Sequence, residues 1–231
     1  MIAGLQKMTL LDYPGKVACT VFLQGCNFRC PFCHNTDLLP REGEEFMTLE
    51  EFSSFLAARK GLIDAVCVSG GEPTLAPELF ELFSAIKAHG YFAKLDTNGM
   101  RPDVLKQLVE EHLVDYVAMD LKSSPSGYAA AAGLPKVARE KIEESIRFLL
   151  TDQVDYEFRT TVVRELHSQE TIQEMGAWIS SFGRPKKLFL QAFQDRETVE
   201  FAGLTTPSDA ELQAFKTALS PYVEQVAIRG E

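Results

Sequence analysis

The feature that most constrains the fold of this 231-residue sequence is a repeated alternation of short apolar segments with longer helical patterns. The apolar segments predict strands over residues 16–24, 64–69, 91–96, 115–120, 155–163, 187–191 and 223–228. Helical patterns lie between them, over residues 47–60, 77–89, 101–112, 137–150, 171–182 and 208–219. Such repetition is typical of right-handed βαβ crossovers and a parallel sheet. The sequence therefore predicts an α/β fold, either a partly closed barrel or an open doubly wound sheet.

Local signals support several of these boundaries. Thr48 with Glu51 forms a capping-box pattern at the first helix, and Gly90 is placed to end the second. The strands read as nearly continuous apolar runs, as expected when both faces of a sheet are covered. No linker rich in proline, glycine or serine interrupts the pattern, so residues 1–231 are expected to form a single domain. The long irregular segment 192–206 is either an ordinary connection or a lid or partner-binding loop.

Composition narrows the choice of partners and location. The formal net charge of −10 disfavours a large nucleic-acid surface, because a polyanion would be repelled overall. No apolar run approaches the length that crosses a bilayer, so no membrane contact is expected. The N-terminus lacks the basic start and apolar middle of a secretory signal. We therefore expect a cytoplasmic protein.

Polar residues gather where successive predicted strands end. Cys26 follows the first strand, the segment 69–73 (SGGEP) the second, 96–99 (DTNG) the third and 120–122 (DLK) the fourth, while Arg159 lies in the fifth. The carboxyl ends of parallel strands share one edge of the sheet, where ligands bind in barrels and in open α/β folds. We expect these groups to meet there.

Three of the five cysteines, Cys26, Cys30 and Cys33, fall within eight residues in the pattern CxxxCxxC. Three soft sulfurs select an iron–sulfur cluster, zinc or copper(I). A structural zinc site would need a fourth ligand, and His34 is too close along the chain to close the same tetrahedron. A cluster held by three cysteines leaves one iron open, which is a catalytic feature. Cys19 and Cys67 lie within apolar strands and are predicted to be core residues.

At this point the sequence resembles the radical S-adenosylmethionine (SAM) superfamily. CxxxCxxC after the first strand, with the aromatic Phe32 just before the last cysteine, is that superfamily's signature, and 69–73 resembles its GGE segment. The resemblance implies a partial (β/α)6 barrel similar to a TIM barrel. It also implies a 4Fe–4S cluster on Cys26, Cys30 and Cys33, whose open iron chelates SAM.

The resemblance further implies a cofactor pocket. The glycine segment would offer backbone groups to the SAM ammonium, and the aspartates and threonine would lie by its carboxylate, in places with a bound monovalent cation. No catalytic residue beyond the cluster is implied, and His34 and Asn35 either tune the cluster or belong to a solvated loop. The implied cofactor-binding residues are Ser69, Gly70, Gly71, Glu72, Asp96, Thr97, Asn98, Asp120, Lys122 and Arg159.

The N-terminal segments 4–16 and 24–31 resemble the activating proteins of anaerobic ribonucleoside-triphosphate reductase, in the glycyl-radical-enzyme activase group. That likeness implies a partner enzyme that receives a glycyl radical, and a flavodoxin- or ferredoxin-like electron donor. Two other enzyme types stay open: an activase of the pyruvate formate-lyase type, and a small-molecule enzyme of the 7-carboxy-7-deazaguanine synthase type. A non-enzymatic iron–sulfur or zinc protein is a further alternative, against which the motifs at the strand ends argue.

Overall fold

The computed structural model describes residues 2–39, 46–199 and 201–229. Its strands form one eight-stranded sheet in which each strand lies beside its neighbour in the chain, from β1 to β8. β1 is antiparallel to β2, and every later pair is parallel. The strands are β1 (Ile2–Thr9), β2 (Ala18–Leu23), β3 (Ala65–Gly70), β4 (Phe92–Thr97), β5 (Tyr116–Asp120), β6 (Asp155–Val162), β7 (Lys187–Ala192) and β8 (Gln225–Arg229).

All six predicted helices are present, and α4 is an additional one. They are α1 (Leu49–Ala58), α2 (Leu79–Ala88), α3 (Pro102–Glu110), α4 (Tyr128–Ala131), α5 (Arg139–Leu149), α6 (Gln169–Ser180) and α7 (Asp209–Leu219). The predicted capping box of Thr48 and Glu51 opens α1, and Gly90 follows α2 with a φ of +81°. Two short 3-10 helices, η1 (Thr36–Leu38) and η2 (Pro73–Leu75), follow the cysteine segment and β3. Within the described ranges, no helix is long and apolar enough to cross a membrane.

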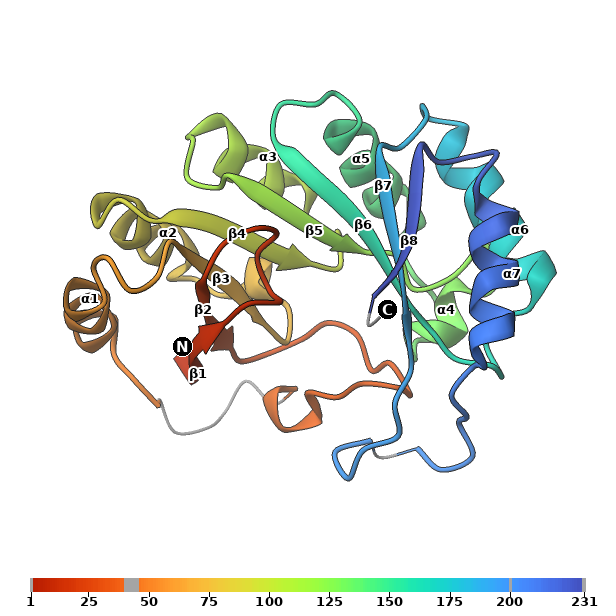
Figure 1. Cartoon of the computed structure of the whole chain (residues 1–231), viewed down its shortest axis with the longest axis horizontal. Helices are drawn as coiled ribbons and strands as arrows, with labels where there is room; N and C mark the ends of the chain where they lie inside the picture. Colours follow the sequence, from red (N-terminus) through yellow and green to blue (C-terminus); the bar gives the residue numbers. More distant parts are fainter. Residues whose placement is uncertain (1, 40–45, 200, 230–231) are drawn as a thin grey trace.

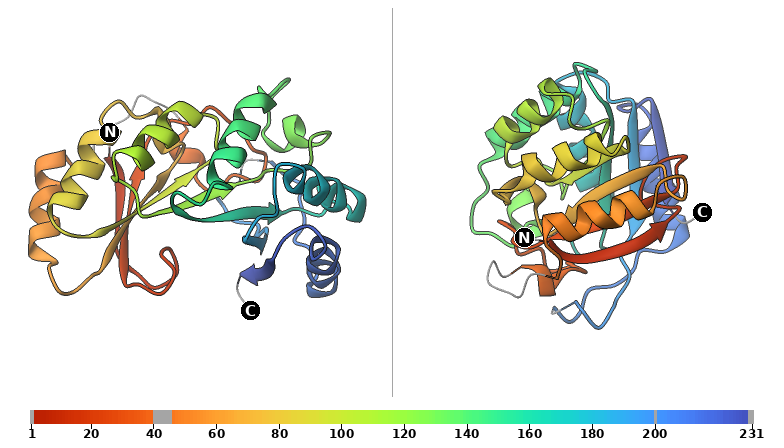
Figure 2. Two further views of the ribbon diagram at one scale, coloured as in Figure 1. Left: turned by 90° about the horizontal axis from the view of Figure 1, so that it is seen from above. Right: turned by 90° about the vertical axis from the view of Figure 1, so that its left-hand side faces the viewer.

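The sheet is curved but not closed. The longer helices form an arc around its outer side (Figure 1), and the view from above shows the sheet as an open crescent (Figure 2). β1 and β8 are the two edges and do not pair with each other. The predicted partial barrel is therefore confirmed, and the doubly wound alternative is excluded because the helices cover one side.

β1 is the strand that the sequence did not predict. It is an edge strand whose centre is exposed, and its pairing with β2 is interrupted by two register shifts. An exposed, irregular edge strand buries too few side chains to give a regular apolar pattern. β1 consequently has little signal beyond its two buried ends, Ile2 and Thr9.

The two faces of the parallel strands differ in chemistry. In β4, Ala93 and Leu95 pack into the large core beneath the helices, whereas Lys94 and Asp96 point the other way, because successive side chains alternate across a strand. Glu157 and Arg159 alternate with Phe158 in β6 in the same manner. The expectation of continuous apolar strands was thus wrong for the inner face, which carries buried charges.

The loop between β1 and β2 forms a floor against the amino ends of several parallel strands. Tyr13 from this loop is buried with Ala18, Ala65 and Tyr116 in a small apolar cluster. The Thr20 hydroxyl donates to Asp12 at 2.5 Å, which fixes the start of the loop. This floor covers the starts of β2, β3 and β5, beside a hollow of about 660 Å³ at the amino ends of β4 to β7.

Candidate active site

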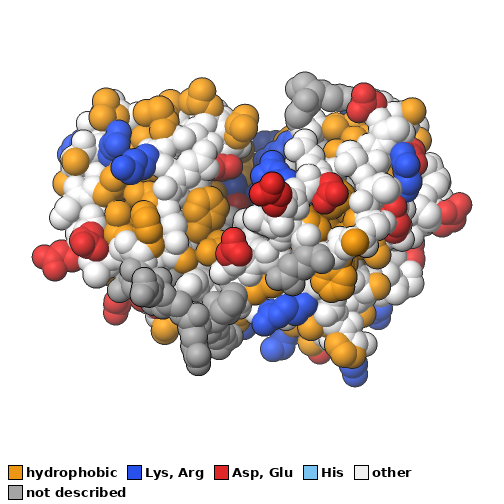
Figure 3. Space-filling view, turned by 90° about the horizontal axis from the view of Figure 1, so that it is seen from below, with side chains coloured by type: hydrophobic (Ala, Val, Ile, Leu, Met, Phe, Trp, Pro, Cys, Tyr) orange, Lys and Arg blue, Asp and Glu red, His pale blue; other side chains and the backbone are white. Residues whose placement is uncertain are grey.

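A cavity of about 250 Å³ lies at the carboxyl ends of the parallel strands. It brings together the three predicted cysteines and every residue that the sequence placed in the cofactor pocket. Its lining includes Cys26, Cys30, Cys33, His34, Asn35, Ser69, Gly70, Gly71, Glu72, Asp96, Thr97, Asn98, Asp120, Lys122 and Arg159. The view from below shows a hollow between the two halves of the molecule, with basic side chains inside it (Figure 3). The predicted meeting of the strand ends is confirmed.

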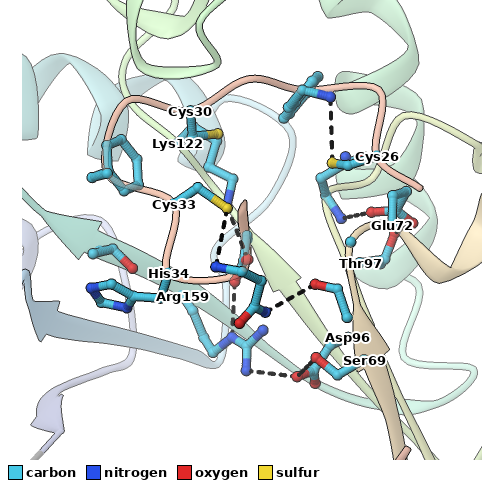
Figure 4. A pocket seen from close by; sticks show the side chains of 18 of the residues that line it. Cys26, Cys30, Cys33, His34, Ser69, Glu72, Asp96, Thr97, Lys122 and Arg159 are labelled. Atoms are coloured by element: carbon cyan, nitrogen blue, oxygen red, sulfur yellow. Dashed lines mark hydrogen bonds and ion pairs between the residues drawn. The ribbon is translucent and has the colours of Figure 1, made fainter. Parts of the chain in front are cut away.

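The cysteine segment arches over this cavity. Cys30 and Cys33 lie on one arm of the arch and Cys26 on the other (Figure 4). Backbone N–H groups point at two of the sulfurs, since Phe28 donates to Cys26 Sγ and Asn35 donates to Cys33 Sγ, both at 3.4 Å. Such donors favour the thiolate that a metal requires. Burial raises the pKa of Cys26 to about 11 and also raises that of Cys30.

The glycine turn after β3 supports the arch from below. Gly71 approaches the backbone so closely that a Cβ there would lie 2.2 Å from the Gly25 carbonyl oxygen. Glu72 N–H donates to that same carbonyl at 2.7 Å, and the Asn35 side chain donates to the Gly70 carbonyl at 3.1 Å. The absence of a side chain at position 71 is therefore what allows the turn to touch the start of the cysteine segment.

Glu72 is buried and serves as a junction between segments. One carboxylate oxygen accepts from the Thr97 hydroxyl at 2.7 Å, and the other accepts from Asn98 N–H at 2.7 Å. The Asn98 side chain in turn donates to Asn27 Oδ1 at 2.7 Å, beside Cys26. The end of β4 is thereby tied both to the glycine turn and to the cysteine arch, and burial raises the pKa of the Glu72 carboxyl despite these bonds.

Charged side chains line the wall opposite the cysteines. Arg159 donates from Nη1 to Asp96 at 3.2 Å and from Nε to Asp120 at 2.9 Å, so it bridges β4 and β5. Lys122 Nζ lies 3.0 Å from the second oxygen of Asp120, and Ser69 donates to Asp96 at 3.0 Å. Figure 4 shows Arg159 and Lys122 directed towards the space below the sulfurs.

These pairs keep the wall fully ionised. Burial alone would raise the pKa of Asp96, but the Arg159 guanidinium and the Lys94 ammonium outweigh it and hold that pKa well below its usual range. Burial alone would lower the pKa of Lys122, yet Asp120 and then Cys30 reverse the shift and raise it. The wall is therefore a fixed array of charges at neutral pH.

His34 lines the cavity, but its ring is engaged by the 192–206 segment. Its ring stacks on Phe193, with centroids 5.8 Å apart, and its Nε2 donates to the Gln194 carbonyl at 2.7 Å. The Thr36 hydroxyl likewise donates to the carbonyl of Thr198 at 2.7 Å. The described part of the 192–206 segment is thus anchored to the chain that follows the cysteines.

The sequence analysis did not assign Leu39, Thr161 and Gln191, which also line the cavity, nor three residues that contact the site from behind. Lys94 is fully buried and contacts Asp96 from the inner face of β4. Asn27 accepts from Asn98, and His167 Nε2 donates to the carbonyl of Lys122 at 2.9 Å. Lys94 and Thr161 had a signal in the sequence, because each stands two positions from a predicted site residue, Asp96 or Arg159, and therefore on the same face of the strand.

An arch of three thiols over a charged pocket, at the carboxyl ends of an open parallel barrel, is the layout of a metal-dependent α/β enzyme. The model of the Radical SAM superfamily matches residues 20–175 of the chain. A protein of Methanocaldococcus jannaschii named "putative glycyl-radical enzyme activating enzyme" is 32% identical over 99% of this chain and 95% of its own length. The pyruvate formate-lyase 1-activating enzyme of Escherichia coli is 26% identical over 97% of both chains.

Solved structures agree at the level of fold. A domain of pyruvate-formate lyase-activating enzyme from Bacteroides vulgatus superposes with a TM-score of 0.59 at 23% identity, over 72% of this chain and 99% of that one. SuiB of Streptococcus suis bound to its precursor peptide gives a TM-score of 0.71 at 15% identity, over 91% of this chain and 48% of that one. The chain belongs to the radical SAM superfamily, and the predicted likeness to the activating enzymes is confirmed.

Proposed function

We propose that this enzyme holds a 4Fe–4S cluster on Cys26, Cys30 and Cys33, cleaves SAM, and generates a glycyl radical on a partner enzyme. The observation that carries the proposal is that the three thiols and the Asp96–Arg159–Asp120–Lys122 array line one cavity. Superfamily membership supports the cluster and SAM. The similarity to activating enzymes along nearly the whole chain supports the glycyl-radical step.

The donor set fits a cluster better than a single metal ion. Among the described residues, no three cysteine, histidine or carboxylate groups converge closely enough to share one ion. In a cubane each cysteine binds a different iron, so its sulfurs stand farther apart than the ligands of one zinc. His34, the nearest candidate for a fourth ligand, is engaged with Gln194 and Phe193. This arrangement leaves three protein ligands.

When bound on Cys26, Cys30 and Cys33, the cluster would supply one electron to SAM, whose S–C5′ bond would break to give methionine and a 5′-deoxyadenosyl radical able to take a hydrogen atom from the substrate. The protein binds, orients and excludes water. Arg159 and Lys122 carry the positive charge that the carboxylate of SAM requires, and the turn at Gly70 and Gly71 permits close approach of its ammonium. Phe28 and Phe32, both buried, line the same cavity and keep water from the thiols.

The finer assignment of the partner rests on the sequence. The segments 4–16 and 24–31 favour an anaerobic ribonucleotide reductase as the protein substrate. Under this proposal residues 1–231 form one catalytic domain that works in the cytoplasm with a flavodoxin- or ferredoxin-like donor. A pyruvate formate-lyase type of partner is the second candidate, favoured by the similarity to activating enzymes of that type from Escherichia coli and Clostridium pasteurianum.

The first experiment tests the cleavage reaction. The protein is reconstituted anaerobically with iron and sulfide, reduced with dithionite and mixed with SAM, and 5′-deoxyadenosine and methionine are quantified by chromatography. We expect both products in equal amounts. A protein with an intact, reduced cluster that forms neither product would reject the enzymatic proposal and leave the non-enzymatic iron–sulfur alternative.

The second experiment identifies the partner. The reduced enzyme and SAM are mixed separately with an anaerobic ribonucleotide reductase and with a pyruvate formate-lyase, and glycyl radicals are counted by electron paramagnetic resonance. We expect the doublet with the reductase. A doublet with the lyase alone would select the second candidate. Cleavage of SAM with no doublet on either protein would favour the small-molecule alternative.

A further inference from the structure

Lys94 is a buried charge that the proposed reaction does not use directly. It lies in β4 with no exposed surface, and its ammonium contacts Asp96 Oδ1 and lies 3.7 Å from Cys67 Sγ. Burial alone would lower the pKa of Lys94, but the Asp96 carboxylate outweighs it and raises the pKa. Lysine is almost never fully buried unless it is paired, and the partner of Lys94 is Asp96.

The resemblance to activases implied a monovalent cation near Asp96, Thr97 and Asp120. The oxygen atoms of these side chains are already engaged. Asp96 Oδ1 accepts a hydrogen bond from Lys94, and Asp96 Oδ2 accepts from Ser69 and Arg159. Asp120 accepts a hydrogen bond from Arg159 on one carboxylate oxygen and from Lys122 on the other. The Thr97 hydroxyl donates to Glu72 and accepts from Gly99 N–H at 3.1 Å.

The charges of this array do not fit an additional cation. Hard cations are held by oxygen atoms whose lone pairs are free to face them. Here each of the four aspartate oxygens already contacts a positive protein group. Three protein cations, Lys94, Lys122 and Arg159, surround the carboxylates of Asp96 and Asp120. A metal ion placed beside these two aspartates would be close to the three cations and repelled by them, whereas the same cations would attract the carboxylate of SAM.

We propose that the Lys94 ammonium takes the place of a monovalent metal ion in this enzyme, so that SAM binds without potassium or sodium. Lys94 is a positioning residue: it shares the Asp96 carboxylate with Arg159 from inside the barrel, so that Asp96 does not cancel the whole charge of the guanidinium and part of it acts on the ligand. The inference rests on the proposed function, because it assumes that SAM occupies this pocket.

The test measures SAM affinity by anaerobic calorimetry of the reconstituted enzyme in potassium, sodium and choline chloride at equal ionic strength. Choline is too large to enter a metal site. We expect the dissociation constant of the unaltered enzyme to agree within about twofold in the three salts. Affinity more than about tenfold weaker in choline than in potassium, a difference of ~1.4 kcal/mol, would overturn the proposal.

The variant Lys94→Met removes the ammonium and keeps the length of the side chain. It should bind SAM at least about tenfold more weakly in choline and recover most of the loss in potassium or sodium, because Asp96 Oδ1 becomes free for a metal ion. Equal weakening in all three salts would contradict the replacement. Lys106→Met, which removes a surface lysine paired with Glu144, is the matched control and should behave as the unaltered enzyme.

One further measurement, thermal melting, supports the test. The melting temperature of the cluster-free Lys94→Met variant should be higher in potassium than in choline. The melting temperature of the unaltered protein should be the same in both salts. If Lys94→Met does not fold, the salt comparison on the unaltered enzyme decides alone. Absence of SAM binding by the unaltered enzyme in every salt would reject the proposed function, and the role of Lys94 with it. Salt-dependent binding would reject the role of Lys94 only.

Discussion

The two ends of the same parallel strands have different tasks. At the carboxyl ends, the cysteine arch, the glycine turn and the Asp96–Arg159–Asp120 array line an open cavity. At the amino ends, Tyr13 packs on Ala18, Ala65 and Tyr116 and covers the starts of the strands. Substitutions at the first end should cost ligand binding, and those at the second should cost stability.

The floor also contains charged side chains, but each of them interacts with another residue of the floor. Glu157 has no exposed surface, accepts from the Tyr116 hydroxyl at 2.9 Å and pairs with Arg229 of β8. Lys16 Nζ lies 3.6 Å from the ring centroid of Phe92 in a cation–π contact. A buried charge therefore does not by itself mark the ligand site. The distinction lies in whether the charged groups line the cavity at the carboxyl ends.

The largest expected effect separates the cysteines of the arch from those of the strands. Cys30→Ala should lose the cluster and SAM cleavage altogether, since a cubane with two remaining thiolates is not retained. Cys67→Ala removes a buried thiol of β3 and should keep both, at a cost of about 1 kcal/mol in stability. Iron and acid-labile sulfide per chain are measured after anaerobic reconstitution. Equal iron in the two variants would contradict the ligand assignment.

The next effect tests the contact between the glycine turn and the arch. Gly71→Ala places a methyl group 2.2 Å from the Gly25 carbonyl oxygen, so the turn and the arch must separate. SAM affinity should fall at least about tenfold, which corresponds to ~1.4 kcal/mol. Calorimetric titration with SAM measures it. Gly4→Ala is the control, because its nearest contact is an ordinary 3.6 Å to Phe22. Unchanged affinity in Gly71→Ala would show that the close approach is dispensable.

A substitution in the floor should lower the stability of the protein and leave SAM affinity unchanged. Tyr13→Ala removes a ring that is 5% exposed and packs against Tyr116 and Phe92. The free energy of unfolding should fall by about 3 kcal/mol, as for other buried aromatic residues. The melting temperature should then drop by roughly 6–12 °C for a chain of this size.

The same loop offers the control for the floor. Leu11 is 84% exposed, so Leu11→Ala should change stability by less than about 0.5 kcal/mol. Melting and SAM titration are run on both variants at a temperature where each is folded. A Tyr13→Ala protein that melts normally but binds SAM poorly would reverse the division between the two ends.

The smallest effect concerns the anchor of the 192–206 segment. His34→Ala removes the stacking on Phe193 and one hydrogen bond, so local opening should become easier by about 1 kcal/mol, or roughly fivefold in amide exchange. Hydrogen exchange of residues 193–199 measures it, and iron content should not change. His89→Ala on α2 is the control, because His89 contacts Ser53 and not the anchored segment. If the exchange rates of residues 193–199 are unchanged in His34→Ala, then His34 does not anchor this segment.

Much of this layout could be predicted from the sequence. The alternation gave the parallel strands and six helices, and the strand-end rule brought the cysteines, Asp96, Asp120 and Arg159 together. Lys94 was not predicted as a site residue because it stands inside the apolar run of residues 91–96, which was interpreted as core. The two-residue period of a strand nevertheless places it on the inner face with Asp96. The partner of His34 lies 160 residues away along the chain, and no local pattern could specify it.

The order of the strands has a consequence for how the chain acquires its structure. Every pairing in the sheet joins consecutive strands, so no pairing waits for a distant part of the chain, and the entropy lost in each closure is that of one strand–helix unit. During synthesis the sheet can grow one neighbour at a time. The cysteine arch follows β2 and is synthesised early, whereas Arg159 belongs to β6. The pocket is therefore complete only after β6 has joined the sheet.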